Sequence, residues 1–345
     1  MHFEIISGQR KWNEFLESYG KEKKDIYFTS SYAKVHELNG EGEARCCLYL
    51  GNNGMKILYP FIITNIPDYG MSSNFYDISS CYGYGGPLVE GFDINDIEEF
   101  EKLLHEWCNE NNVVAEFIRF HPIFKNHEIF RNNIIIEKNR ETVYLDLTKT
   151  MEEIWNSSIT SKARNQIRKA QKSGVIIREN QSLNSFLDIY HQTMNRLNAD
   201  DFYYYSNEYF DELSKFIPDN MIVLEALFEE RVVAASLFMF MGDYIHYHLS
   251  GSLREYLNLC PNNLLIYHAI EYGINKKMTK MHLGGGATNK NDDTLLQFKQ
   301  NFSKNLSDFY IGKRVHNQRI YEQLMHEWEE KNGKKARIFL QYENN

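Results

Sequence analysis

The 345-residue chain has few cysteines and prolines and no long apolar segment. Its five cysteines are scattered and none is spaced as C-x-x-C, which fits neither a disulfide framework nor a zinc site, so we expect buried free thiols. The longest nearly apolar run, Val232 to Met241, is about half as long as a bilayer-spanning helix, and the amino terminus lacks the apolar core of a signal peptide. We therefore expect a cytoplasmic protein.

Two nucleotide-binding motifs are also missing. No G-x-G-x-x-G opens a helix after a strand, and no G-x-x-x-x-G-K-[ST] occurs, which excludes nicotinamide and P-loop chemistry. The formal net charge of −9 means that the surface as a whole should not attract polyanions. Any contact with nucleic acid must use a local basic patch.

Enough hydrophobic sequence is present for two packed domains of mixed α/β class. Hydrophobic residues at 43% and aromatics at 14% exclude disorder, and domains usually hold about 100 to 200 residues. Strand-like runs alternate with helical patterns in both halves. The run TVYLDL ends near Asp146, so we expect one domain at 1–150 and a second at 151–324. Helical periodicity is clearest at Ile94 to Asn111, Met151 to Ser173, Leu183 to Leu197, Asn262 to Asn275, Thr294 to Phe302 and Asn317 to Lys331.

A basic helix is predicted in TSKARNQIRKAQKSGV, ending at Gly174. Three apolar residues form a narrow stripe, and the remaining surface is basic and includes Lys162 and Arg164. The pattern suits an anion site for the phosphates of a nucleotide or a tRNA. It suits a solvated surface helix equally well.

An aromatic cluster follows Arg196 in TMNRLNADDFYYYSNEYF. Tyrosine has an apolar body and a polar tip, which suits a pocket for a sugar, a base or a peptide. The alternative is that these rings close the domain core with their hydroxyls at the surface. The cluster comprises Phe202, Tyr203, Tyr204, Tyr205, Tyr209 and Phe210.

The strand YIHYHLSGS places His246 and His248 on one face, because side chains alternate along a strand. Two histidines without a further ligand do not make a zinc site, and no H-E-x-x-H occurs. We expect no metal, and we expect these rings to form hydrogen bonds in the core or in a pocket.

The segment HLGGGATNKNDDTLLQFKQNFS combines a glycine run with a lysine in an apolar arc. Gly284, Gly285 and Gly286 allow unusual dihedrals or close approach of the backbone to a ligand. A short helix then begins, with Asp292 or Asp293 as its N-cap, and Lys299 falls inside its apolar face. Lysine is almost never fully buried without a partner, so its stem snorkels or its ammonium faces a pocket.

Several short motifs together resemble the FemABX family of peptidoglycan-bridge aminoacyltransferases, within the GNAT-like superfamily. The resemblance implies two tandem GNAT-like domains with mixed sheets flanked by helices, and a C-terminal segment, 325–345, that packs back on the first domain. The motifs run in family order from about Asp77 to Leu324: DISSCYGYGGPL, EFIRFHPI, TVYLDL, the basic helix with TMNR, YHLSGS, LGGG, FKQNF and YIGKRVHNQRIYEQL.

The resemblance also implies the chemistry. Phe298 and Lys299 match the Phe-Lys pair at the family's acyl-transfer site, where Lys299 would stabilise negative charge during direct attack by an amine. His248 or Asp77 could take the proton from that amine. Substrate contacts are expected from the basic helix, Arg196, the tyrosine cluster and the glycine run: Lys162, Arg164, Arg196, Tyr204, Tyr205, Tyr247, Gly284, Gly285 and Gly286.

Two donors are compatible with this resemblance, and no permanently bound cofactor is expected. The first is aminoacyl-tRNA, whose aminoacyl group would pass to an amine of a UDP-muramyl peptide or a lipid-linked precursor, the latter bringing peripheral membrane contact. The second is acyl-CoA, with an amino sugar or amino acid of a surface polysaccharide as acceptor. The CoA motif [QR]-x-x-G-x-[GA] is absent, since QKSGVI ends in Ile176, but LNLCPNNLL, with Pro261 opening a helix, keeps CoA open.

Overall fold

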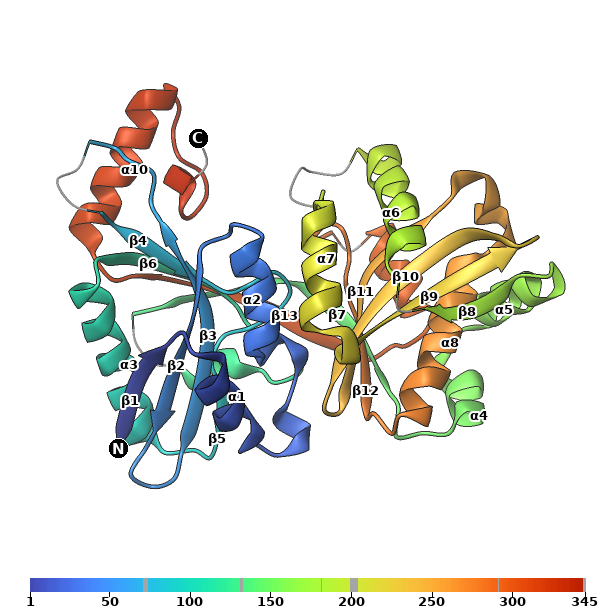
Figure 1. Cartoon of the computed structure of the whole chain (residues 1–345), viewed down its shortest axis with the longest axis horizontal. Helices are drawn as coiled ribbons and strands as arrows, with labels where there is room; N and C mark the ends of the chain where they lie inside the picture. The colour runs from blue at the N-terminus through green and yellow to red at the C-terminus, as the bar shows by residue number, and fades with distance from the viewer. Residues whose placement is uncertain (71–73, 131–132, 181, 199–203, 291, 344–345) are drawn as a thin grey trace. The chain divides into compact units, whose positions relative to one another are not determined.

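The computed structural model describes the chain except residues 71–73, 131–132, 181, 199–203, 291 and 344–345. It divides into two compact units (Figure 1). Unit 1 comprises Met1–Gly20, Tyr27–Asn139 and Phe309–Asn345, and unit 2 comprises Lys21–Ile26 and Arg140–Asp308. The units meet between Asn139 and Arg140 and between Asp308 and Phe309, and not at a single border after residue 150. The reason is that two long strands, β7 and β13, each run from one unit into the other.

Unit 1 is built on a mixed sheet with the strand order β1-β2-β3-β4-β6-β13, and β5 pairs with β3. Only the β4–β6 pair is parallel among the registered pairs of this unit. The strands are β1 (His2–Ile6), β2 (Glu43–Leu50), β3 (Lys56–Asn65), β4 (Tyr76–Ser79), β5 (Leu88–Glu90), β6 (Val113–Arg119) and the larger part of β13 (Leu306–Val315).

The helices of unit 1 pack on this sheet through amphipathic faces. Helix α3 (Ile94–Glu110) begins at Asp93, whose carboxylate accepts two backbone N–H groups, and its buried residues join the core of β2, β3 and β6. Helices α1 (Gln9–Glu17) and α2 (Ser30–Leu38) pack near β2 and β3. Helix α10 (Gln318–Asn332) packs its buried face against residues of β6, and the segment after it joins the same cluster.

The sheet strands of unit 2 have the order β7-β12-β11-β10-β9-β8. The β11–β12 pair is parallel, and the other registered pairs of this unit are antiparallel. The strands are β7 (Ile135–Asp146), β8 (Ile176–Asn180), β9 (Met221–Phe228), β10 (Arg231–Met241), β11 (Tyr244–Ser252) and β12 (Lys280–Gly285).

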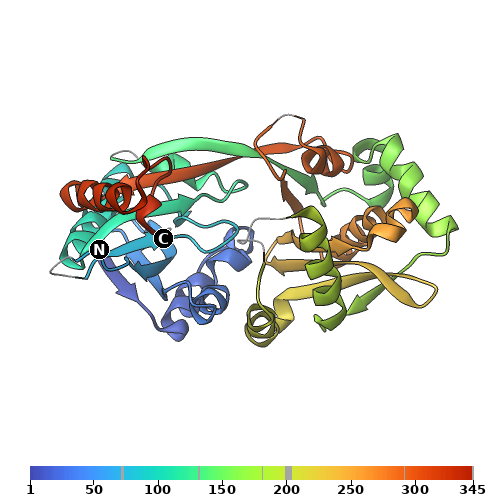
Figure 2. The same ribbon diagram turned by 90° about the horizontal axis from the view of Figure 1, so that it is seen from above.

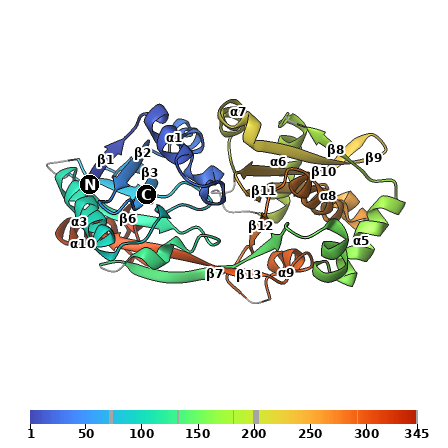
Figure 3. The ribbon, with the colours of Figure 1, turned by 90° about the horizontal axis from the view of Figure 1, so that it is seen from below.

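Helices cover both sides of the unit 2 strands. Figures 2 and 3 show α6 (Asn184–Leu197) and α7 (Asn207–Phe216) on one side, and α5 (Ser161–Lys172), α8 (Pro261–Asn275) and α9 (Thr294–Gln300) on the other. The main core of the unit joins α5, α8 and α9 to the sheet. The mixed α/β class expected from the sequence is therefore confirmed.

The predicted helix from Met151 to Ser173 is interrupted. A short α4 (Met151–Glu153) passes into a π turn (Ile154–Ser158), and α5 then starts anew with Thr160 as its N-cap. The break arises because Ile159 leaves the helical conformation and is buried, while the Thr160 side chain accepts the Ala163 N–H. Four cysteines are buried free thiols and Cys260 is half-buried.

Candidate active site

Lys299 is buried on α9, with only 7% of its surface exposed. Asp293 caps the helix by accepting the Leu296 N–H at 2.9 Å. The Lys299 ammonium donates to the Gly285 carbonyl oxygen at 2.7 Å and lies 5.6 Å from the centre of the Tyr247 ring. The side chain therefore turns inward to the end of β12.

The surroundings of Lys299 disfavour its charge. Burial lowers the pKa of Lys299 to about 7, the Asp293 carboxylate partly offsets this shift, and the Arg140 guanidinium adds to it. At neutral pH the protonated and neutral forms are both well populated. A desolvated ammonium of this kind interacts strongly with any negative charge that develops beside it.

The glycine run allows two charged side chains to lie against the backbone. Gly284 has φ +75°, and a Cβ at Gly285 would lie 2.8 Å from Cδ of Arg140. Arg140 donates to the Gly286 carbonyl oxygen at 2.8 Å. Two neighbouring carbonyls are thus held by two cations, Lys299 and Arg140. No sequence pattern singled out Arg140, because its role depends on the pairing of β7 with β12.

Gly286→Ala is expected to loosen α9. The new Cβ would lie 2.4 Å from Oδ1 of Asp293, whose carboxylate is already fixed by Thr288 and by the cap bond to Leu296. Loss of an N-cap costs about 0.5–2 kcal/mol, and the measurement is the free energy of unfolding in urea. Lys304→Ala is the control, because Lys304 is exposed and lies outside the helices and strands. Equal stability of the two variants would contradict the assigned role of Gly286.

Strand β11 carries the two other aromatic candidates. Tyr247 is half-buried and packs against the unit 2 core, and burial raises its pKa. His248 is half-buried, and its Nε2 lies 3.3 Å from the hydroxyl of Tyr209 on α7. Phe298 is half-buried in the same core as Tyr247 and makes an edge contact with Phe302.

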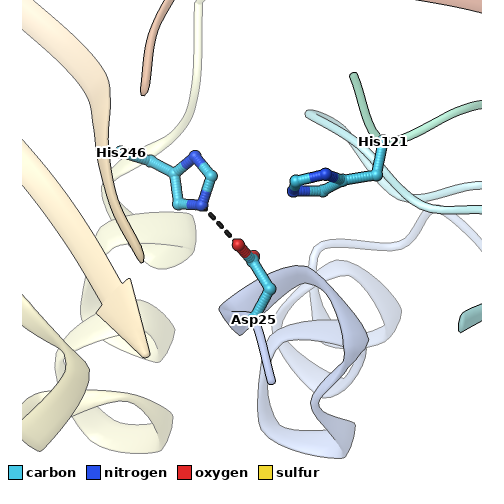
Figure 4. A group of neighbouring side chains, drawn as sticks. All are labelled: Asp25, His121 and His246. Carbon is cyan, nitrogen blue, oxygen red and sulfur yellow. Dashed lines mark hydrogen bonds and ion pairs between the residues drawn. The ribbon is translucent and has the colours of Figure 1, made fainter. Parts of the chain in front are cut away.

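His246, two residues before His248, forms a buried pair within unit 2. Its Nε2 lies 2.7 Å from Oδ2 of Asp25 (Figure 4), and both side chains are almost fully buried. Its ring also makes an edge contact with His282 on the neighbouring strand. Sequence reasoning did not single out Asp25, since the segment Lys21–Ile26 has no motif and joins unit 2 only in the folded chain.

The three basic residues expected to contact substrate differ in exposure and in hydrogen bonding. Lys162 is exposed on α5, whereas Arg164 donates to the backbone carbonyls of Trp155 and Ile159 and so supports the turn before α5. Arg196 is half-buried and donates to the carbonyl oxygen of Ser252 at 2.5 Å, at the end of β11. Of this group, Lys162 has its charged end turned to solvent.

Helix α5 is tied to two other helices of unit 2. The N–H of Thr160 donates to the Asn301 carbonyl oxygen at 2.8 Å, which joins the start of α5 to the end of α9. Asn263 at the start of α8 donates to Oε1 of Gln166 at 3.1 Å. The basic helix therefore lies beside both the Lys299 helix and the N-terminus of α8.

The tyrosine cluster contributes to the core more than to an open surface. Tyr205 is buried and stacked on Tyr209, with ring centres 4.2 Å apart, whereas Tyr204 is 38% exposed. Phe202 and Tyr203 lie outside the described residues.

Asp77 belongs to unit 1, where its contacts are structural. Its Oδ1 accepts the Ala115 N–H at 2.9 Å and the Tyr342 hydroxyl at 3.0 Å, which joins β4 to β6 and to the C-terminal segment. Burial, together with the charge of Glu343, raises the pKa of Asp77 well above its usual range.

A pocket of about 600 Å³ also lies in unit 2, along the C-terminal half of α8 and the ends of β8 and β9. Its lining includes His268, Glu271 and Tyr272 and none of the residues described above. We do not assign the transfer chemistry to this pocket, because it contains neither Lys299 nor the glycine run.

Comparison with known proteins identifies a domain and a fold. Residues 157–300, which include Lys299, match the acetyltransferase (GNAT) domain family. No curated protein matches the sequence. A crystal structure of FemX matches with a TM-score of 0.70 at 16% identity, covering 94% of this chain and 99% of FemX.

Two further solved structures share the fold. The C-terminal domain (DUF2156) of a putative lysylphosphatidylglycerol synthetase from Agrobacterium fabrum matches with a TM-score of 0.56 at 11% identity, covering 92% of this chain and 94% of that one. L-PGS from Bacillus licheniformis matches with a TM-score of 0.53 at 13% identity, covering 89% and 92%. At such identities these matches establish the fold.

The GNAT domain match covers part of the chain, and the match to FemX covers nearly all of it. The fold of FemX extends over nearly the whole chain and confirms the expected pair of GNAT-like domains. The matched domain confirms the expected enzyme class. Residues 157–300 therefore match a GNAT acetyltransferase domain, which indicates an acyltransferase, and the chain as a whole has the fold of FemX.

Proposed function

We propose that this protein transfers an aminoacyl group from aminoacyl-tRNA to an amine of a peptidoglycan or other cell-envelope precursor. One observation carries the proposal: a buried ammonium, Lys299, lies at the glycine end of β12 inside the GNAT-matched domain. The FemX fold supports this choice of reaction over other acyl transfers.

In this reaction the acceptor amine attacks the ester carbonyl of the donor directly. The carbonyl oxygen gains negative charge, and Lys299 stabilises it as a preorganised positive charge in a water-poor site. Phe298 and Tyr247 help to keep that site apolar, and Arg140 and Asp293 hold the backbone around it. Alignment of donor and amine supplies much of the remaining acceleration.

The donor is proposed to bind along α5 and the N-terminus of α8. Lys162 offers an exposed cation, and the first N–H groups of a helix attract anionic groups. Arg196 braces the neighbouring end of β11 through Ser252. A polyanion such as tRNA would thus be held by a local basic surface of an acidic protein.

The second candidate is a CoA-dependent N-acyltransferase that acts on an amino sugar or amino acid of a surface polysaccharide. The matched family is one of acetyltransferases, and Pro261 at the first turn of α8 leaves a helix N-terminus suited to a pyrophosphate. Neither candidate needs a permanently bound cofactor or a metal.

The acceptor is proposed to be a UDP-muramyl peptide or a lipid-linked precursor met at the cytoplasmic side of the membrane. No helix among the described residues is both long and apolar enough to cross a bilayer. With a lipid-linked acceptor, contact with the membrane would be peripheral and made through the substrate.

Mass spectrometry of the acceptor tests both candidates. UDP-muramyl pentapeptide and lipid II are incubated with the protein and either a charged tRNA pool or acetyl-CoA, and Lys304→Met serves as a control beside Lys299→Met because Lys304 is exposed. A residue-sized mass gain that needs tRNA and Lys299 supports the first candidate. An acetyl gain with CoA supports the second candidate, and no gain with either donor rejects both reactions on these acceptors.

Binding of charged tRNA is expected to weaken as salt rises, because each phosphate contact releases counterions. Lys162→Ala should lower the slope of log K against log salt concentration by about 0.7 to 0.9, the value for one lost phosphate contact. The measurement is a filter-binding titration at several salt concentrations. Lys304→Ala is the matched control on the same unit, and an affinity that does not depend on salt would reject the basic-helix assignment.

A further inference from the structure

The outer face of α5 carries a row of exposed cations. At 100° per residue they fall within an arc of about 120°, opposite the buried stripe of Ala163, Ile167 and Ala170. The first and the last lie about 15 Å apart along the helix axis, at 1.5 Å per residue. The four cations are Lys162, Arg168, Lys169 and Lys172. We call this surface the outer face of α5.

Within the part of the chain that the structure describes, none of these four cations forms an ion pair with a carboxylate. Arg178 and Arg231, elsewhere in unit 2, are each paired with a glutamate, at 2.7 Å and 3.5 Å. The protein as a whole has a net charge of −9, so a row of uncompensated positive charges is a local exception. Such a row attracts a polyanion to this one face.

An aromatic ring borders the outer face of α5 at Arg168. Trp155 lies in the π turn Ile154–Ser158, and π turns are rare and occur often at functional sites. The ring is half-buried, packs on the unit 2 core and makes an edge contact with Tyr267, with ring centres 5.4 Å apart. The guanidinium of Arg168 lies over the Trp155 ring, 5.1 Å from its centre.

The turn that carries Trp155 is held in place by α5 itself. Arg164 donates to the carbonyl oxygen of Trp155 at 2.9 Å and to that of Ile159 at 2.5 Å. The N–H of Thr160 donates to the carbonyl oxygen of Asn301 at 2.8 Å, which places the start of α5 beside the end of α9. The ring and the cations are therefore fixed relative to one another and to the helix of the candidate lysine.

We propose that the outer face of α5 binds the single-stranded end of the donor tRNA, with one base stacked on the guanidinium of Arg168. Unpaired bases stack on aromatic rings and on arginine planes, because every base has a π face. Trp155 supports the guanidinium from below, and the three lysines contact the phosphates along the strand. A duplex cannot make the stacking contact, since its bases are already stacked and paired.

This inference rests on the proposed function and deepens it. The aminoacyl ester of a charged tRNA is at the unpaired end of the molecule. A face that holds this end beside α9 therefore brings the ester toward Lys299, and it selects single-stranded RNA over other polyanions.

Arg168→Lys keeps the charge and removes the planar guanidinium. We expect the affinity for a single-stranded RNA oligonucleotide with the sequence of the tRNA 3′ end to fall about fivefold, the lower end of the effect of losing one stacked base. The slope of log K against log salt concentration should not change, because the charge is kept. Lys169→Gln should instead lower that slope by about 0.7, the value for one phosphate contact of a single strand.

The measurement is filter binding of the oligonucleotide at several salt concentrations. Arg231→Lys is the matched control, because Arg231 is also an exposed arginine over an aromatic ring, that of Tyr256, at 5.4 Å. We expect this variant to bind the oligonucleotide as the wild type does.

Tryptophan fluorescence reports the same contact directly. Binding of the single strand should change the emission of Trp155, and a double-stranded RNA with the same number of phosphates should not. Trp155→Phe should remove this change, whereas Trp107→Phe, which alters a half-buried tryptophan of unit 1, should keep it.

The outcomes separate this inference from the proposed function. An affinity for the single strand that is equal in Arg168→Lys and in the wild type, or equal to that for the duplex, overturns the inference. Binding of acetyl-CoA that Arg168→Lys weakens, with no binding of the single strand, also overturns it. A protein that binds the single strand through Arg168 but transfers no aminoacyl group from charged tRNA keeps this binding surface and rejects the proposed function.

Discussion

Lys299→Met is expected to reduce transfer by about 10² to 10³-fold, the usual effect of losing one preorganised group that stabilises an oxyanion. The ammonium donates to the Gly285 carbonyl oxygen, whereas the neighbouring cation, Arg140, is bonded to the next carbonyl oxygen, that of Gly286. The measurement is the initial rate of acceptor modification with a charged tRNA pool. A variant that keeps more than a third of the wild-type rate would contradict the role of Lys299.

The fold of Lys299→Met should survive, which makes the result interpretable. Burial lowers the pKa of Lys299 to about 7 in the folded state, so at neutral pH the buried lysine binds fewer protons than it does in the unfolded chain and lowers stability. Methionine has a similar length and carries no charge, so the melting temperature should be equal or higher. Lys304→Met, five residues on and exposed, should change neither rate nor melting temperature.

The pH profile distinguishes a fixed charge from a group that must lose its proton. If protonated Lys299 stabilises the transition state, the rate falls as pH rises through about 7, because the ammonium is lost. Lys299→Arg stays charged at every accessible pH, so it should have a lower rate but no such alkaline fall. A different result would favour a role in proton transfer. In that case Lys299→Met would lose the alkaline fall, and Lys299→Arg would be inactive at every pH.

The sequence was sufficient to find this lysine and insufficient to place its neighbours. A lysine on the apolar face of a helix departs from the amphipathic pattern, which is how the sequence singles it out. In the structure its ammonium is buried and donates to the glycine run. The glycines also fit a close approach, since Cβ atoms at Gly285 and Gly286 would meet Arg140 and Asp293. Arg140 itself lies on a strand 159 residues away in the chain from Lys299 (299 − 140), so no local period could reveal it.

Local periodicity also misses irregular geometry. Alternation predicted that His246 and His248 share a face, but it could not show the bulge at His248 or the pairing of His246 with Asp25. The sequence predicts one basic surface on this helix, whereas Arg164 donates to backbone carbonyls and Lys162 is exposed. Such differences depend on register and on tertiary contacts, which one sequence does not contain.

Unit 1 has a buried charge network, and removing its cation is the second substitution for which we expect a large effect. Arg314 on β13 lies directly opposite Glu116 on β6, 3.5 Å from its carboxylate, and 3.2 Å from Glu101 on α3. Glu116 is fully buried and also accepts the Tyr59 hydroxyl at 2.6 Å. Burial alone would raise the pKa of Glu116, but Arg314 and His316 outweigh it and lower this pKa to about 2.

Arg314→Met is expected to lower the free energy of unfolding by about 3–5 kcal/mol at pH 7, because it leaves two buried carboxylates without their cation. The measurement is urea unfolding followed by fluorescence. Arg45→Met is the control, since Arg45 pairs with the exposed Glu43 and a surface pair contributes about 0–1 kcal/mol. Equal losses in the two variants would show that the network contributes no more than a surface pair.

The sign of the pH dependence tests the same network independently. In the wild type the folded pKa of Glu116 lies below its usual 4.5, so its contribution is complete above pH 4.5 and is lost as pH falls toward 2. Without Arg314, burial dominates and the folded pKa rises above 4.5, so protonation stabilises the variant as pH falls below neutrality. The stability difference between wild type and Arg314→Met should therefore shrink between pH 7 and pH 4. A difference that stays constant over this range would mean that Arg314 acts through packing on Phe130, whose ring lies 4.7 Å away, rather than through charge.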